Sequence, residues 1–184
     1  MKRFFYLLTL AAAASIIVSC ATVTIEERTN DKAALVYGYI NMQQQSQSVN
    51  WMSALQFTPP TEKPYWSLAI KDGYFFNEKF VPGTYCINSF GTDSRTFKLS
   101  YEVGCFEIEK SDLYFFGSYE MVWREGESPS LKRAHNPGEA DVIEMILQST
   151  DKGTYWEDKL KKRLAILRQA EMRKSKIPRA PAIQ

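Results

Sequence analysis

Side chains able to do acid–base or nucleophilic chemistry are few in this chain. His135 is the only histidine, and it lies in the polar segment Lys132–Pro137. A serine hydrolase would need that histidine as its base together with a G-x-S-x-G turn, which the sequence lacks. Zinc would need an HExxH motif or paired-cysteine spacing, and neither occurs. The sequence therefore predicts no catalytic, cofactor-binding or metal-ligating residue.

Carboxylates and aromatic side chains are the remaining candidates. Two carboxylates of a glycosidase could come from the glutamates on neighbouring predicted strands, namely Glu102, Glu107, Glu109 and Glu120. Carboxylates that alternate with apolar residues usually form the solvent-facing side of a sheet, and we expect that role here. Tyr65 and Trp66 follow a proline-rich stretch, so they are the candidates for an exposed aromatic patch that binds a glycan or a protein. Core packing accounts for most other aromatic residues.

Cys20 ends an N-terminal segment with the composition of an export signal. Basic residues in Met1–Arg3 precede the uncharged apolar run Phe4–Val18. A helix of this length spans roughly 22 Å, which is less than the ~30 Å hydrocarbon core of a bilayer. The run is therefore too short for a transmembrane anchor. The other alternative is a plain secretory signal that is cut after Ser19.

The residues before this cysteine suggest a lipid anchor. Ile17-Val18-Ser19-Cys20 resembles the lipobox of bacterial lipoproteins, in which a diacylglycerol is attached to the cysteine and the preceding peptide is removed. The resemblance implies a signal peptide at residues 1–19 and lipidation of Cys20. The following residues are polar and lack strong periodicity, so a tether is expected over residues 20–32; the alternative is a first edge strand through Val23 and Ile25. Ala21 stands where some bacteria read a sorting signal, and it favours the outer membrane because it is not aspartate. We expect a lipid-anchored envelope protein at the outer membrane, facing the periplasm.

Cys86 and Cys105 would then lie in an oxidising compartment. A disulfide between them would close a loop of about 20 residues and contribute roughly 3 kcal/mol in the chain-entropy model. The alternation of Thr96–Val103 changes phase before Phe106, which predicts a bulge at Gly104–Cys105. This phase change places Cys105 on the same outward side as Cys86. The pattern permits the disulfide and leaves its formation open.

The elements that position these residues follow from hydrophobic periodicity. Alternation with a period of two extends from Ala33 to Arg124 and predicts seven or eight short strands in an antiparallel sandwich or barrel. Asp72-Gly73 predicts a hairpin turn. In the last long strand, one face is expected to carry Leu113, Phe115, Tyr119, Met121 and Trp123, with Gly117 at the gap.

A helical period follows the strands. Asn136 as N-cap and Pro137 in the first turn predict the start of one helix. Thr154–Glu157 matches a capping box and predicts the start of a second helix, which runs to about Lys174. Apolar residues at helical spacing predict that both helices pack on the sheet. The helical extension is expected at residues 136–176, followed by a tail at 177–184.

Three short segments also mark a family likeness: Ile70–Gly73, Val81–Ile87 and Leu113–Ser118. They resemble segments of small bacterial envelope proteins with a prealbumin-like (transthyretin-like) β-sandwich, several of which are lipoproteins. The shared features are a P-G-x-Y turn and an aromatic-Gly-Ser strand. The resemblance implies a β-sandwich over residues 33–124 and no catalytic residues. The two C-terminal helices lie outside the plain sandwich.

Charge is unevenly distributed after the leader. Residues 21–150 contain 11 basic and 17 acidic residues, whereas residues 151–184 contain 10 basic and 4 acidic residues. Either the basic tail folds back on the acidic body, or it contacts anionic lipid headgroups or other anionic envelope polymers. We expect no nucleic-acid partner.

These features predict a lipid-anchored cell-envelope protein with a non-catalytic β-rich domain that binds a protein partner or scaffolds a complex. The alternative is a periplasmic module that binds glycan or peptidoglycan. That alternative is based on the Trp and Tyr content and on the basic tail.

Overall fold

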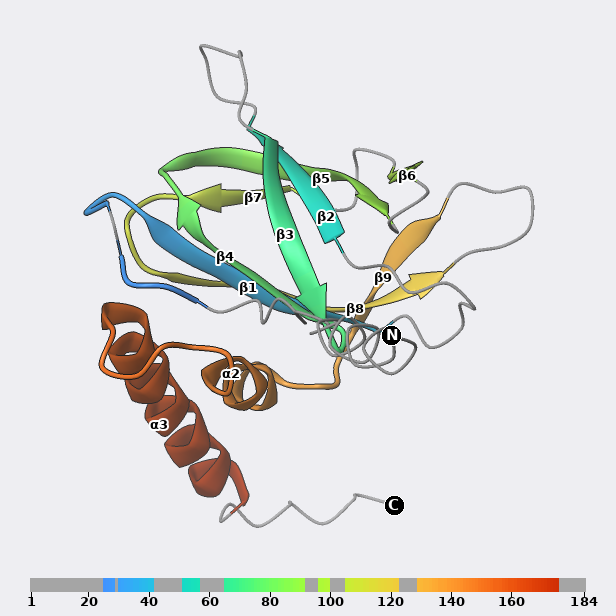
Figure 1. The fold of residues 1–184 in the computed structure, drawn as a ribbon. Helices are drawn as coiled ribbons and strands as arrows, with labels where there is room; N and C mark the ends of the chain where they lie inside the picture. The colour runs from blue at the N-terminus through green and yellow to red at the C-terminus, as the bar shows by residue number, and fades with distance from the viewer. Residues whose placement is uncertain are drawn as a thin grey trace, which may run out of the picture.

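The computed structural model describes residues 25–28, 30–41, 51–56, 65–91, 96–99, 105–122 and 129–175. Cys20, Glu102, Gly104 and Trp123, with the sequence predictions made for them, lie outside the described residues, as do the proposed signal peptide and the tail 177–184. Within the described part, the chain is mainly β with two helices at its C-terminal end, as predicted (Figure 1). No helix among these residues is long and apolar enough to cross a membrane.

The described part contains nine strands. They are β1 (Ala34–Asn41), β2 (Trp51–Gln56), β3 (Tyr65–Lys71), β4 (Tyr74–Phe80), β5 (Gly83–Gly91), β6 (Thr96–Lys98), β7 (Cys105–Ile108), β8 (Leu113–Val122) and β9 (Ser130–Ala134). They are hydrogen-bonded in the order β6-β5-β2-β3-β4-β1-β8-β9, and β7 also pairs with β5. Every pairing among them is antiparallel except that of β1 with β8, which is parallel. β9 extends the sheet beyond the predicted boundary at residue 124.

The sheet folds over on itself and forms the two layers of a sandwich. Phe106 of β7 and Phe116 of β8 belong to strands at distant places in the strand order, yet their ring centroids lie 5.4 Å apart. Phe116 also meets Phe75 of β4 at 5.8 Å. Figure 1 shows β5 and β7 in one layer and β1 and β8 in the other. The predicted fold, a β-sandwich with C-terminal helices, is confirmed.

Strand β1 is buried on both faces. Val36 and Ile40 point into the core inside the sandwich, whereas Leu35 and Tyr37 belong to a second core between the sheet and the helices. A strand covered on both sides needs apolar residues at consecutive positions, which explains the nearly continuous apolar run of β1. The parallel pairing with β8 places that strand beside β1 in the same layer.

One prediction for β8 is wrong. The residues expected on a single face divide between the two cores: Leu113 and Phe115 pack toward the helices, whereas Tyr119 and Met121 lie inside the sandwich. The pairing register between β1 and β8 shifts by one residue at Gly117, so the alternation of side chains changes there. Gly117 has a φ of 122°, a conformation that glycine adopts without steric cost.

Helix α2 (Glu139–Leu147) begins later than predicted. Its N-cap is Gly138 rather than Asn136, because the Gly138 carbonyl accepts the first helical hydrogen bond, from the N–H of Val142 at 3.1 Å. The N–H of Gly138 in turn donates to a carboxylate oxygen of Asp141 at 3.1 Å. The carboxylate of Asp141, in the first turn of the helix, thus accepts the free N–H at the helix start. The sequence predicted that the side chain of Asn136 would cap the helix instead.

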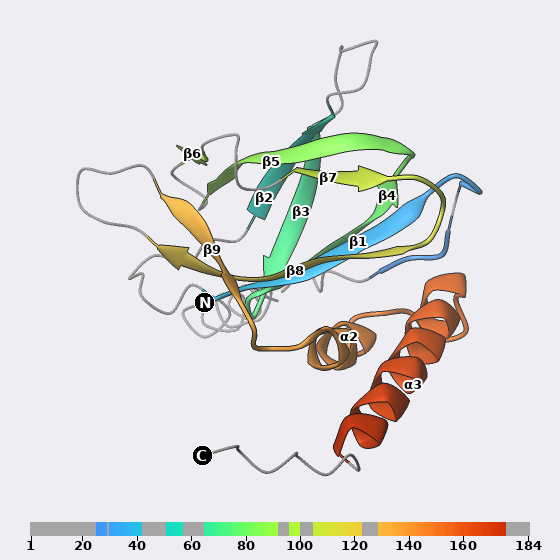
Figure 2. The ribbon, with the colours of Figure 1, turned by 180° about the vertical axis from the view of Figure 1, so that it is seen from behind.

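Helix α3 (Tyr155–Ser175) begins at the predicted capping box. The N–H of Glu157 donates to Thr154 Oγ1 at 3.3 Å, and the Glu157 carboxylate accepts from the N–H of Gly153 at 2.5 Å. In a standard capping box the Glu157 carboxylate would accept the N–H of the N-cap residue, Thr154. Here it accepts the N–H of Gly153, one residue earlier. Trp156 and Leu160 are fully buried against the sheet and α2. Figure 2 shows both helices on the outer side of the layer that contains β1 and β8.

Candidate functional site

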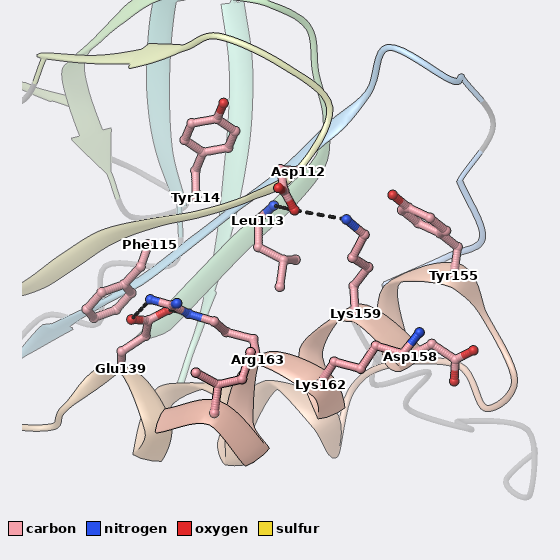
Figure 3. Close-up of a pocket in the computed structure, with 11 residues that line it drawn as sticks. Asp112, Leu113, Tyr114, Phe115, Glu139, Tyr155, Asp158, Lys159, Lys162 and Arg163 are labelled. Carbon is pink, nitrogen blue, oxygen red and sulfur yellow. Dashed lines mark hydrogen bonds and ion pairs between the residues drawn. The ribbon is translucent and has the colours of Figure 1, made fainter. Parts of the chain in front are cut away.

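A pocket of about 810 Å³ opens between the beginning of β8 and helix α3 (Figure 3). Leu113 and Phe115 line it from the sheet, and Ile166 lines it from the helix. Charged residues surround this apolar surface: Asp112, Glu139, Asp158, Lys159, Lys162 and Arg163. The pocket therefore combines an apolar surface with side chains of both charges.

Periodicity explains why these side chains meet. Tyr155, Lys159, Lys162 and Ile166 are three or four residues apart, so they lie on one face of α3. The adjacent face of the same helix carries the buried Trp156, which attaches the helix to the body. On β8, the residues before the bulge at Gly117 alternate so that Leu113 and Phe115 point out of the sandwich toward the helices.

Glu139 is the junction between β1, α2 and α3. Its carboxylate accepts a hydrogen bond from the Tyr37 hydroxyl at 2.7 Å. It also accepts hydrogen bonds from Nε and Nη2 of Arg163, at 2.9 and 2.8 Å. Burial, and after it the negative charge of Glu139, raises the pKa of Tyr37 far above its usual range. Tyr37 therefore stays protonated and acts as a hydrogen-bond donor. The fork of Arg163 is occupied by this carboxylate.

Lys159 is likewise engaged with a carboxylate. Its ammonium lies 3.1 Å from Asp112 Oδ1, which also accepts the N–H of Leu113 at 2.9 Å. Burial alone would raise the pKa of Asp112, but the Leu113 N–H and the Lys159 ammonium outweigh it and lower this pKa. Lys162 has no ion-pair partner among the described residues. Among the described residues it is thus the one cation of the pocket lining that makes no ion pair.

The lowered pKa of Asp112 makes stability depend on acidity. A carboxylate whose folded-state pKa lies below its unfolded value of about 3.9 contributes stability above that pH and loses it as the pH falls through the folded value. We expect Asp112→Asn to destabilise the protein at pH 6 and to reduce the further loss between pH 6 and pH 3. Urea unfolding at both pH values measures this difference.

Asp158→Asn is the matched control, because Asp158 lines the same pocket, is exposed and has no ion pair within the described part. This variant should keep the full acid-induced loss of the wild-type protein. An identical loss in both variants would contradict the role given to Asp112.

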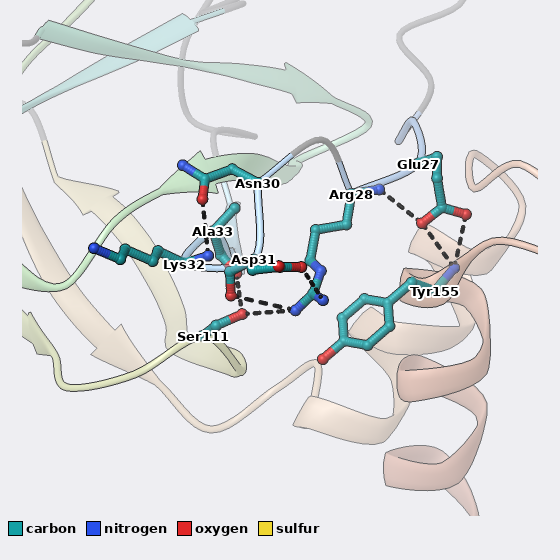
Figure 4. A network of polar contacts seen from close by, with 8 residues as sticks. All are labelled: Glu27, Arg28, Asn30, Asp31, Lys32, Ala33, Ser111 and Tyr155. Carbon is teal, nitrogen blue, oxygen red and sulfur yellow. Dashed lines mark hydrogen bonds and ion pairs between the residues drawn. The ribbon is translucent and has the colours of Figure 1, made fainter.

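The rim of the pocket at Tyr155 is occupied by the N-terminal segment (Figure 4). The guanidinium of Arg28 lies 4.1 Å from the centroid of the Tyr155 ring, and Lys159 Nζ lies 5.6 Å from it. The Glu27 carboxylate accepts the backbone N–H of Tyr155 at 3.1 Å, which caps the positive end of α3. The face of this ring beneath Arg28 is therefore not open to a stacking ligand.

The residues singled out by sequence lie elsewhere. Tyr65 and Trp66 begin β3, but their side chains lie outside the described part. His135 is exposed between β9 and α2. Cys86 of β5 and Cys105 of β7 are directly paired across the two strands and joined by a disulfide, the bond that sequence alone left open. Cys86 is buried and Cys105 is exposed.

The described part of the basic C-terminal segment, which includes helix α3, folds back on the acidic body. Arg168 of α3 donates to Glu144 at 2.8 Å and to Asp141 at 2.9 Å, both in α2. Its hydrogen bonds to Glu144, Glu171 and Asp141 raise the pKa of Arg168 above its usual value. Together with the ion pairs of Lys159 and Arg163, these contacts agree with the alternative in which the basic segment folds back on the acidic body.

Sequence reasoning did not find the pocket. The helical spacing of Lys159, Lys162 and Ile166 was visible, but nothing local indicated that α3 crosses the beginning of β8. Comparison with models of protein families, with curated proteins and with solved structures finds no match to this chain. Among the described residues, no group of His, Cys, Asp or Glu side chains is arranged to hold a metal ion. What the protein binds is therefore inferred from its own residues.

Proposed function

We propose that the protein is a lipid-anchored component of the cell envelope whose domain binds another protein through helix α3. The leader and the lipobox-like segment Ile17–Cys20 support the anchor. The pocket and the exposed face of α3 support binding. The likeness to prealbumin-like envelope proteins and the outer-membrane location stay predictions from the sequence.

One surface feature carries the binding proposal, and we call it the α3 stripe. It consists of Lys162, Ile166, Gln169 and Arg173, which are three or four residues apart and all exposed. Ile166 is 59% exposed and lines the pocket, so an apolar side chain is accessible at the pocket edge. Lys162 and Arg173 have no ion-pair partner within the described part. The stripe thus presents an isoleucine between two cations that make no ion pair within the described part.

The chemistry of the stripe indicates its partner. An acidic protein segment with an aliphatic or aromatic anchor would complement it in charge and in apolar surface. Lys162 and Ile166 also line the pocket, so the anchor side chain could enter the pocket beside Leu113 while a carboxylate contacts Lys162. Neither Lys159 nor Arg163 is needed for this contact, because both already bind carboxylates.

Photo-crosslinking in cells tests the stripe. A photoreactive residue in place of Ile166 should crosslink to one dominant protein, and Lys162→Glu with Arg173→Glu should lower the yield about tenfold, the equivalent of ~1.4 kcal/mol. The same residue in place of Lys98, an exposed position in β6, is the control. Equal products from both positions, or a yield that charge reversal leaves unchanged, would contradict the proposed surface.

The anchor has its own test. Cys20→Ala should leave the precursor unlipidated with its leader uncut, as measured by mass spectrometry and membrane fractionation. A variant that still matured and fractionated with the membrane would show that the thiol is not the attachment point.

Glycan binding is the alternative, and the described residues favour it less. Tyr114, Phe115 and Tyr155 are the aromatic residues of the pocket lining, and Arg28 covers one face of the Tyr155 ring. Retention of the protein on purified cell-wall sacculi at low salt would favour the glycan reading over the protein partner.

A further inference from the structure

Ile25 is part of the folded domain rather than of a tether, and it forms an isolated β-bridge with Thr150. It is fully buried in the core between the sheet and the helices. Its N–H donates to the Ser149 carbonyl at 2.8 Å, and its own carbonyl accepts the N–H of Asp151 at 3.2 Å. Both backbone groups of Ile25 are thus bonded to the segment that joins α2 to α3.

The residues that follow Ile25 are also attached. Glu27 binds the N-terminus of α3, as described above, and Arg28 lies over the ring of Tyr155. The guanidinium of Arg28 further donates to Asp31 at 2.9 Å and to Ser111 Oγ at 3.2 Å (Figure 4). Ile25 is therefore fixed to the domain, and only the four residues 21–24 separate it in the chain from Cys20.

The short tether limits how the domain can sit on a membrane. Five residue steps from Cys20 to Ile25 span at most about 18 Å when fully extended. A compact domain of this size has a diameter of about 40 Å. We infer that the lipid on Cys20 holds the α2–α3 turn, residues Asp151–Thr154, against the headgroup surface, and that the opposite end of the sandwich points away. This inference rests on the lipid anchor of the proposed function.

Electrostatic attraction does not produce this orientation. The exposed charged residues that adjoin Ile25 in the chain or belong to the segment bonded to it are Glu26, Glu27, Asp151 and Lys152, so this end of the domain is not basic. Anionic headgroups would repel it slightly or leave it unaffected. Tether length is the physical cause, and the orientation should therefore form on zwitterionic lipid.

Strand β6 supplies the comparison point, because it lies on the opposite side of the molecule from α3 in both views (Figures 1 and 2). Lys98 in β6 and Lys152 in the α2–α3 turn are both exposed lysines. A fluorophore placed at either position by an unnatural amino acid leaves the cysteines unchanged.

The experiment uses the full lipidated protein in phosphatidylcholine vesicles that carry a quencher on the headgroup. Quenching should be about threefold stronger at position 152 than at position 98, because the tether is shorter than the domain. Insertion of about twelve Gly and Ser residues between Thr24 and Ile25 should remove most of the difference. Equal quenching at the two positions with the natural tether, in protein whose Cys20 is acylated, would overturn the orientation alone. A bare Cys20 thiol by mass spectrometry would overturn both the anchor and the orientation.

Discussion

Replacement of Trp156 by alanine is expected to lower the free energy of unfolding by about 3–5 kcal/mol. Trp156 is fully buried in the core between the sheet and the helices. Its neighbours there come from β1, β4 and α2, which are held by their own hydrogen bonds and cannot close around the vacated space. Urea denaturation followed by circular dichroism measures the change.

Ile166→Ala is the matched control, because Ile166 lies on the same helix but is largely exposed. A surface truncation of this kind should change stability by less than about 0.5 kcal/mol. Comparable effects of the two substitutions would mean that α3 does not bury Trp156 on the body in solution. Every contact assigned to the pocket would then need revision.

Removal of the disulfide should have an effect of similar size. Cys86→Ser combined with Cys105→Ser is expected to cost about 3 kcal/mol, since the bond links residues 19 apart and restricts the unfolded chain. Within the described part, β7 pairs only with β5, so the bond also attaches this short strand to the sheet. Urea unfolding in oxidising buffer compares the variant with the wild-type protein.

Reductant provides the internal control for this comparison. Reduced wild-type protein should lose nearly the same stability as the double variant, and the double variant should not respond to reductant. Equal stability of both proteins in oxidising buffer would show that the bond does not form. The stripe on α3 is distant in the fold, so the folded variant should retain crosslinking from Ile166.

Local chemistry made several elements predictable. Asp72 and Gly73 both adopt positive φ, 51° and 86°, in the turn between β3 and β4, as a D-G pair between two strands indicates. The capping box at Thr154 marked the first turn of α3 correctly because its hydrogen bonds join residues within four positions of each other. The alternation with a period of two from Ala33 to Arg124 predicted a mainly β fold, because this pattern too depends only on residues close together in the chain.

Other features depended on contacts between distant segments. The bulge at Gly117 changes which residues of β8 face the helices, and it follows from parallel pairing with β1, about 80 positions earlier in the chain. For Ile25 the sequence left a tether and an edge strand both open, because the two residues that bind it, Ser149 and Asp151, are more than 120 positions away. A local pattern carries no information about either pairing.

By itself, the sequence determined the class of fold, the turn at Asp72-Gly73 and the start of α3, since each depends on residues close together in the chain. The export signal with its cysteine stays a prediction from the sequence. Only the tertiary structure decided where the pocket lies. Asp112 and Lys159 are separated by 47 positions, and Tyr37 and Glu139 by 102. Such pairs form because burial of Trp156 and Ile25 draws the helices onto the sheet. The geometry of that packing, which no local pattern specifies, leaves Lys162 and Ile166 exposed at its edge.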